Sequence, residues 1–139
     1  MVPHRKSRVI PPPHDCPLTV CLKIIAGTWT GNVIWYLRGG PRRFLELKAD
    51  LRGVSAKTLA ARLRRLGGDG IVFRRSMPTS PPTVEYGLTE LGKKLVPAVE
   101  AIASVGVELQ KLKASGEYSA GANGSAHAQG ADLPRLETA

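Results

Sequence analysis

The chain of 139 residues has only two cysteines, too few for the disulfide framework that stabilises small secreted domains. It also lacks any apolar run near the ~18 residues that a membrane-spanning helix requires. The first fifteen residues are too polar and proline-rich to form the hydrophobic part of a secretory signal. These absences exclude disulfide-rich and membrane-spanning classes and lead us to expect a cytoplasmic protein with no membrane partner.

The residue groupings that carry out catalysis are also missing. No nucleophile has a recognisable base, no paired carboxylates stand at a useful spacing, and no glycine-rich loop is suited to a phosphate. His4, His14, Cys16 and Cys21 come nearest to a zinc ligand set, but the two histidines fall in a polar, proline-rich segment. We therefore predict that the protein is not an enzyme and uses neither a metal nor a cofactor.

Acidic residues are scarce relative to basic ones. Eleven Asp and Glu face twenty Lys and Arg, which gives a formal net charge of +9. Residues 16–113 hold sixteen of the basic residues and only seven of the acidic ones. A folded region this basic commonly binds a polyanion, either nucleic acid or an anionic membrane. A charge that serves only solubility remains an alternative at this point.

Composition divides the chain into three parts. Residues 1–15 are rich in proline and basic side chains, and we expect them to form a flexible basic arm because they can bury little apolar surface. Residues 114–139 are dominated by Ala, Gly and Ser, which predicts a disordered tail. The folded domain should therefore occupy residues 16–113.

Hydrophobic periodicity predicts the elements of this domain. Apolar residues recur at helical spacing in four short segments and one long one, and two segments between them alternate like strands. The predicted helices cover 17–26, 30–38, 44–50, 56–66 and 89–113, and the strands cover 71–76 and 83–88. This order indicates a mainly α protein with a small β-hairpin (α+β), namely a winged helix-turn-helix.

The helix predicted at 56–66 carries the strongest functional signal. Its leucines form one narrow seam that should dock on the preceding helices, and Ser55 should cap its start. No acidic residue occurs between Gly53 and Gly68, so the outward face is cationic and has small side chains. Such a face suits the major groove of DNA, whereas a solvated surface helix usually mixes charges. The residues assigned to DNA are Ser55, Lys57, Thr58, Ala61, Arg62, Arg64 and Arg65.

Four further arginines are candidates for phosphate contacts beside the groove. Arg42 and Arg43 precede the third predicted helix, and Arg74 and Arg75 are adjacent on one strand of the hairpin. Neighbouring residues on a strand point to opposite faces, so at least one of Arg74 and Arg75 should reach the backbone. Phosphate contacts would set affinity, and base contacts would set sequence preference.

These segments resemble the HxlR family of bacterial winged-helix regulators. The resemblance implies a homodimer that places two recognition helices in successive major grooves, with the terminal helices in the dimer contact. The sequence departs from the family pattern in three places. Thr28 stands where lysine is frequent, Gly67 and Gly68 replace residues better suited to a helix, and Gly87 stands where serine or a similar residue is usual. The resemblance is carried by GTWT (27–30), GPRRFLEL (40–47), GVSAKTLAARLRRL (53–66), GIVFRR (70–75) and PPTVEYGLTELGKKLVP (81–97).

The spacing of apolar residues in the last helix independently favours a dimer. They recur at alternating intervals of four and three, the pattern of a helix that packs on another helix. Pro97 should kink this helix or divide it in two. Packing on its own domain alone is the alternative. The predicted interface comprises Leu18, Leu22, Leu91, Leu95, Ala98, Ile102, Val105, Leu109 and Leu112.

The two cysteines receive different predictions. Cys16 stands at the start of the first helix, where free backbone amides favour a thiolate. The family resemblance implies a sensor of oxidants or electrophiles at this position, and an inert thiol is the alternative. Cys21 lies on the apolar stripe of the same helix and is predicted to be in the core. A bridge between the two within one chain is disfavoured, since they lie on different sides of the helix.

The sequence thus predicts a nucleoid-associated, sequence-specific transcriptional regulator whose partners are double-stranded DNA and a second copy of itself. Two alternatives remain, a general nucleoid-type DNA-binding protein and a protein-interaction module that uses the seam of the last helix. The domain is too small for a separate ligand-binding unit.

Overall fold

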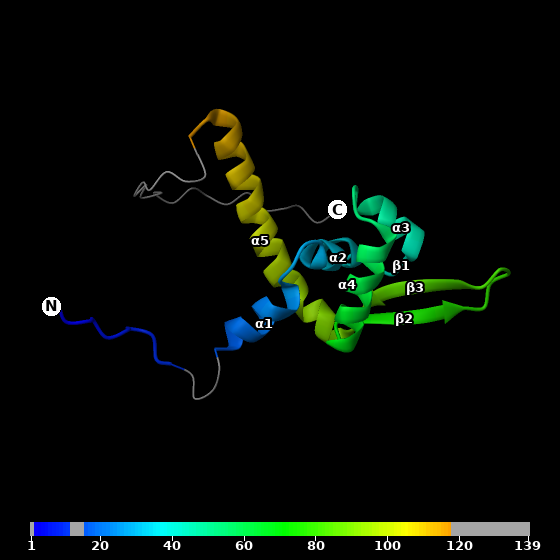
Figure 1. The fold of residues 1–139 in the computed structure, drawn as a ribbon, viewed down its shortest axis with the longest axis horizontal. Helices are drawn as coiled ribbons and strands as arrows, with labels where there is room; N and C mark the ends of the chain where they lie inside the picture. The colour runs from blue at the N-terminus through cyan, green and yellow to red at the C-terminus, as the bar shows by residue number, and fades with distance from the viewer. Residues whose placement is uncertain (1, 12–15, 118–139) are drawn as a thin grey trace.

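The computed structural model describes residues 2–11 and 16–117 of the chain. All five predicted helices and both strands of the hairpin are present, and a short third strand joins them (Figure 1). The elements are α1 (Pro17–Ile25), α2 (Thr30–Leu37), β1 (Arg42–Arg43), α3 (Phe44–Asp50), α4 (Ala56–Gly68), β2 (Val72–Met77), β3 (Thr83–Leu88) and α5 (Glu90–Ser115). The architecture is the predicted winged helix-turn-helix.

The ends of the chain are described only in part. Residues 2–11 form no helix or strand and are exposed. Residues 1 and 12–15 of the predicted arm, and 118–139 of the predicted tail, lie outside the described residues. Ala114 and Ser115, assigned to the tail from composition, belong to α5, which ends at Gly116 with a positive φ of 78°.

The sheet is antiparallel with the strand order β1-β3-β2. β3 is the central strand, and Tyr86 pairs with Arg42 on one side and with Arg74 on the other. The sequence missed β1, because two residues are too few to show an alternating pattern. The hairpin of β2 and β3 projects from the body on the side opposite α1 (Figure 1).

The core lies between α2, α3, α4 and the base of the sheet. Three residues of α2, namely Val33, Ile34 and Leu37, are buried as the sequence predicts. The leucine seam of α4 is also confirmed, because Leu59, Leu63 and Leu66 are all at most 3% exposed. α4 continues through Gly67 and Gly68, although glycine in a helix costs about 1 kcal/mol relative to alanine.

α5 is one continuous helix of 26 residues, so of the two outcomes predicted for Pro97, a kink or a division into two helices, the division does not occur. A proline removes one backbone hydrogen bond, and the contacts of Leu95, Val96 and Val99 with the core hold the helix together on both sides of that position. Figure 1 shows α5 passing α2 with its C-terminal end clear of the other elements.

The first helix differs from the prediction. α1 contains no buried residue, and its stripe of Leu18, Cys21 and Leu22 faces solvent. The assignment of Cys21 to the core is therefore wrong for the single chain. An apolar stripe marks a face that packs on something, and no described element of this chain covers it. Among the described residues no single helix is long and apolar enough to cross a membrane. Only when α1 and α2 are taken together are the length and apolar content sufficient, and these two helices meet at 87°.

Candidate nucleic-acid interface

The start of α4 is fixed by the cap that the sequence predicts. The Oγ atom of Ser55 accepts a hydrogen bond from the backbone N–H of Thr58 at 3.1 Å and donates one to Thr58 Oγ1 at 2.9 Å. These bonds satisfy a free amide of the first turn. Both side chains take part in these hydrogen bonds. Ser55 and Thr58 therefore stabilise the start of α4, and they also lie near its exposed face.

The exposed face of α4 consists of Lys57, Ala61 and Arg64. These residues are four and three positions apart, which places them on one side of a helix. Lys57 and Arg64 are exposed, and within the described part of the chain neither side chain forms an ion pair or a hydrogen bond. Ala61 between them is small and half-buried. A flat cationic face of this kind can approach the edges of bases closely.

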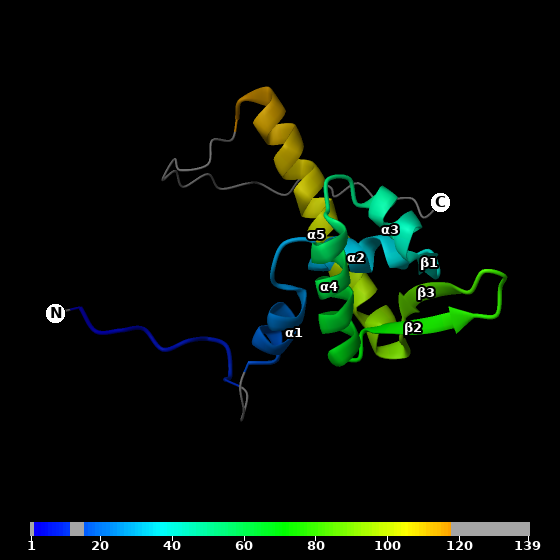
Figure 2. The ribbon, with the colours of Figure 1, turned by 45° about the vertical axis from the view of Figure 1, so that its right-hand side comes forward.

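The flank of α4 that faces α1 is built differently. Arg62 Nε donates a hydrogen bond to the carbonyl oxygen of Thr28 at 2.8 Å, and Arg65 Nη2 donates one to that of Lys23 at 2.7 Å. Both acceptors belong to residues 23–29, a segment made of the last turn of α1 and the link to α2, which we call the connector. Figure 2 shows α1 alongside α4 at this place. The two arginines therefore bind backbone of their own chain, whereas the sequence predicted that both would face DNA.

The structure distinguishes the two arginines of the hairpin. Arg74 is exposed and lines a cleft of 460 Å³ between β2 and the second half of α4, together with Arg64. Arg75 points to the other face of the sheet, where Nη2 lies 3.1 Å from Glu85 Oε2 and the guanidinium carbon lies 5.4 Å from the centroid of the Phe73 ring. Arg64 and Arg74 thus form one cationic pair from the helix and the hairpin.

Arg42 and Arg43 also differ in their surroundings. Arg42 donates hydrogen bonds to Asp50 at 3.0 and 3.1 Å and pairs with Glu46 at 3.4 Å. The hydrogen bonds to Asp50 raise the pKa of Arg42 above its usual value. Arg43 is exposed. Arg42 is thus neutralised by its neighbours, whereas Arg43 stands at the surface.

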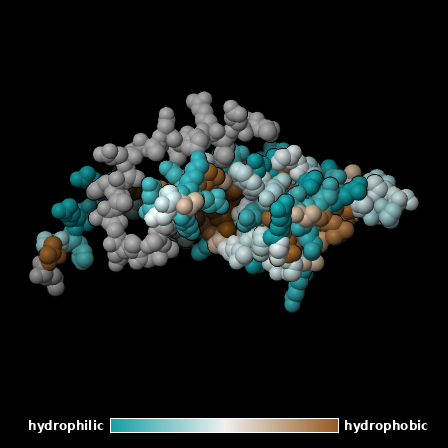
Figure 3. Space-filling model, turned by 90° about the horizontal axis from the view of Figure 1, so that it is seen from above, coloured by the Kyte–Doolittle hydropathy of each residue, from teal (hydrophilic) through white to brown (hydrophobic). Residues whose placement is uncertain are grey.

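Apolar side chains remain exposed along α5 and α1. Of the predicted seam, Leu91 is 53% exposed, Ile102 56% and Val105 51%, and Leu18 on α1 is 63% exposed. Ala98, Leu109 and Leu22 are exposed as well, and Leu95 and Leu112 are half-buried. Brown hydrophobic surface lies open beside hydrophilic side chains in Figure 3. Apolar side chains that are exposed together in this way are typical of surfaces that contact another molecule.

Both cysteines are free and exposed. Cys16 is the residue that precedes α1, and its side chain makes no capping hydrogen bond. Within the part of the chain that the structure describes, no group of three or more His, Cys, Asp or Glu is placed to hold a metal ion.

The comparisons with known proteins agree with this arrangement. A family model described as HxlR-like helix-turn-helix matches residues 24–114. The uncharacterized HTH-type transcriptional regulator YkvN of Bacillus subtilis is 36% identical over 105 residues, which cover 75% of this chain and 89% of that protein. The chain belongs to the HxlR-like helix-turn-helix family, and it is a transcriptional regulator of the helix-turn-helix type.

Solved structures extend the comparison. The redox regulator HypR in its oxidized form superposes with a TM-score of 0.64 at 35% identity, over 67% of this chain and 96% of that one. The reduced form of the transcriptional regulator YodB from B. subtilis gives a TM-score of 0.60 at 33% identity, over 66% of this chain and 90% of that one. The winged-helix body is therefore shared along nearly the whole length of these regulators.

Proposed function

We propose that the protein binds operator DNA as a homodimer and regulates transcription of genes near that site. The observation that carries the proposal is the cationic face of Lys57, Ala61 and Arg64 on α4, with Arg74 of the hairpin beside it. In this arrangement α4 enters the major groove, and the cleft between Arg64 and Arg74 receives the phosphates at its edge.

A homodimer completes this proposal. A single helix reads only a few base pairs, and a two-fold dimer places two recognition helices about 34 Å apart, one turn of DNA. The exposed seam of α5 and the uncovered stripe of α1 supply the apolar surface for such a contact. The same surface argues against a monomer, because it would otherwise remain in contact with water.

We further propose that oxidants or electrophiles act on the protein through Cys16. Its exposed thiol stands directly before α1, and α1 is tied to α4 through the hydrogen bond between Arg65 and Lys23. HypR, whose fold this chain shares, is named a redox regulator, which supports the same kind of control here.

The decisive experiment for sequence-specific binding is selection from a pool of random DNA. The full chain should enrich a two-fold symmetric site, and that site should compete at least 100-fold better than unrelated DNA at raised salt. A Lys57→Ala, Arg64→Ala double variant should lose the enrichment. Lys111→Ala serves as the control, because it removes an exposed positive charge from α5. Equal binding of all sequences would instead identify a general DNA-coating protein.

A further inference from the structure

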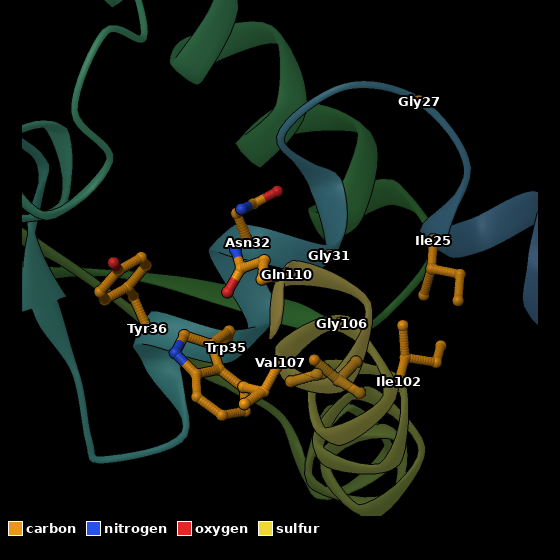
Figure 4. A pocket seen from close by; sticks show the side chains of 12 residues that line it. Ile25, Gly27, Gly31, Asn32, Trp35, Tyr36, Ile102, Gly106, Val107 and Gln110 are labelled. Atoms are coloured by element: carbon orange, nitrogen blue, oxygen red, sulfur yellow. The ribbon is translucent and has the colours of Figure 1, made fainter. Parts of the chain in front are cut away.

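A cavity of 500 Å³ that is open to solvent on one side lies between α5 and the first two helices, away from the outer face of α4. Figure 4 shows its walls. Ile25 of α1 and Ile102 of α5 stand at one end, and Trp35 of α2 and Val107 of α5 stand at the other. Ligand sites in proteins commonly have volumes of about 300–1,000 Å³, and sites between helices are frequent among them.

The residues that line this cavity limit the kinds of ligand that can bind in it. Among the described residues, no Lys, Arg, His, Asp or Glu lines it, although these side chains are common in the chain. Its polar groups are the amides of Asn32 and Gln110 and the hydroxyl of Tyr36. A charged ligand would find no opposite charge in this lining to replace the water molecules that it gives up on binding. The lining therefore suits a neutral molecule that carries a hydrogen-bonding group.

The shape of the lining favours a flat ligand. Gly31 on α2 and Gly106 on α5 leave open space, since a Cβ atom at either position would meet no other atom within 4 Å. The ring of Trp35 supplies an aromatic wall and is itself fixed, because the guanidinium carbon of Arg38 lies 3.5 Å from its centroid. Aromatic walls bind planar rings by stacking or edge contacts.

The cavity is distinct from the proposed dimer seam. On α5 the cavity is lined by Val99, Ala103, Gly106 and Gln110, each one residue beyond a member of the seam. One residue turns a helix by about 100°, so this stripe faces α1 and α2 of the same chain and the seam faces elsewhere. Ile102 is the one residue that belongs to both.

The cavity also touches the connector that α4 holds. Ile25 and Gly27 line it, and they lie between Lys23 and Thr28, whose carbonyl oxygens accept the hydrogen bonds from Arg65 and Arg62. A molecule in the cavity therefore contacts the same short segment that sets the position of α4 relative to α1.

We propose that this cavity is an effector site for a small, neutral, planar aromatic molecule, which adjusts DNA affinity through the connector of residues 23–29. The regulatory part rests on the proposed DNA-binding function. The binding part does not, and it can be tested without DNA.

The binding test is a calorimetric titration of the full chain with benzamide, a neutral ring that carries an amide. Benzoate and benzylamine, its charged relatives of similar size, are the matched probes. Benzamide should bind saturably at one site per chain and at least tenfold more tightly than either charged probe. No saturable binding of benzamide, or equal binding of benzoate, would overturn the proposal.

Two variants locate the site. Gly106→Leu places a side chain in the cavity and should weaken benzamide binding at least tenfold, whereas Ala114→Leu, one turn beyond the cavity on α5, should change it less than twofold. Asn32→Leu, at an exposed position, should weaken binding at least fivefold and covers the case in which Gly106→Leu does not fold. A Gly106→Leu protein that folds but no longer dimerises would show that the second copy fills the cavity, which overturns the ligand assignment.

The regulatory test measures the dissociation constant for the selected DNA site with and without saturating benzamide. The constant should change at least threefold in the natural chain and not in Gly106→Leu. Benzamide binding with no change in DNA affinity would overturn the regulatory part. Failure of the chain to prefer any DNA site would instead overturn the proposed function, while the calorimetric result would still decide the effector site.

Discussion

The guanidinium of Arg65 donates a hydrogen bond to the carbonyl oxygen of Lys23 across 2.7 Å, and this bond joins the C-terminal turn of α1 to α4. The last carbonyls of a helix have no partner within the helix, and a positive charge near them is stabilising. Arg64, the next residue along α4, is exposed and lines the cleft beside Arg74. Two adjacent arginines therefore serve different purposes.

Alanine at these two positions should have opposite consequences. Arg65→Ala should lower the free energy of unfolding by about 1 kcal/mol, the usual net value of one hydrogen bond. Arg64→Ala should change stability by less than about 0.5 kcal/mol but reduce the slope of log K against log salt for DNA binding by about 1. Thermal denaturation and binding at several salt concentrations measure the two effects. The assignment is wrong if Arg64→Ala is the less stable variant.

Two glycines of α5 offer a second contrast. A Cβ atom at Gly92 would overlap the carbonyl group of Ile71, whereas one at Gly106 would meet nothing within 4 Å. Backbone cannot move aside as a flexible side chain can. Gly92→Ala should therefore destabilise the fold by about 1–3 kcal/mol. Gly106→Ala should stabilise it by about 0.5–1 kcal/mol, since alanine favours helix. Chemical denaturation measures the free energy of unfolding of both variants. A change in the same direction for the two would refute the prediction.

Much of the fold could be predicted from local sequence pattern. The spacing of Leu59, Leu63 and Leu66 indicated the buried side of α4, and Ser55 caps that helix as expected. Thr89 caps α5 in the same way by accepting from the backbone N–H of Gly92. These features depend on residues within a few positions of one another, which is the range over which helical periodicity and capping act.

The features that were missed depend on distant partners. Arg62 and Arg65 bond to residues 34 and 42 positions away, and the helical wheel contains no information about them. The same limit applies to Cys21. An apolar stripe looks the same whether it packs on its own domain or on another molecule, and the sequence interpretation placed Cys21 in the core although it assigned Leu18 and Leu22 of the same stripe to the dimer contact.

The ion pair between Arg75 and Glu85 leads to a prediction for the hairpin. Glu85 neutralises a positive charge on the strand next to Arg74, and its side chain is only 23% exposed. Glu85→Gln should leave Arg75 free and strengthen DNA binding, and it should steepen the salt dependence by about one unit of slope. Glu108→Gln, which makes the same charge change on α5, should leave both quantities unchanged. Weaker binding by Glu85→Gln would indicate that the carboxylate positions Arg75 for contact.

The seam of α5 can be tested by placing a charge in it. Val105 is 51% exposed in the single chain and does not line the effector cavity. In a dimer, Val105→Glu would bury an unpaired carboxylate next to its two-fold copy, which costs several kcal/mol. Sedimentation should therefore show a dimer for the natural chain and a monomer for Val105→Glu. A folded monomer in both cases would contradict the dimer, and a dimer in both would place its interface elsewhere.

The two exposed cysteines allow the redox proposal to be tested residue by residue. Treatment with diamide removes two electrons and two protons from a pair of thiols and leaves a disulfide. A bridge within α1 is disfavoured by geometry, so oxidation should link two chains. The natural chain and Cys21→Ser should form this linked dimer on a non-reducing gel and change their DNA affinity at least threefold, and dithiothreitol should reverse both effects. Cys16→Ser should do neither. If Cys16→Ser responds to diamide like the natural chain, Cys21 is the reactive residue instead. If diamide changes the DNA affinity of none of the three proteins, the proposal that oxidation regulates this protein is wrong.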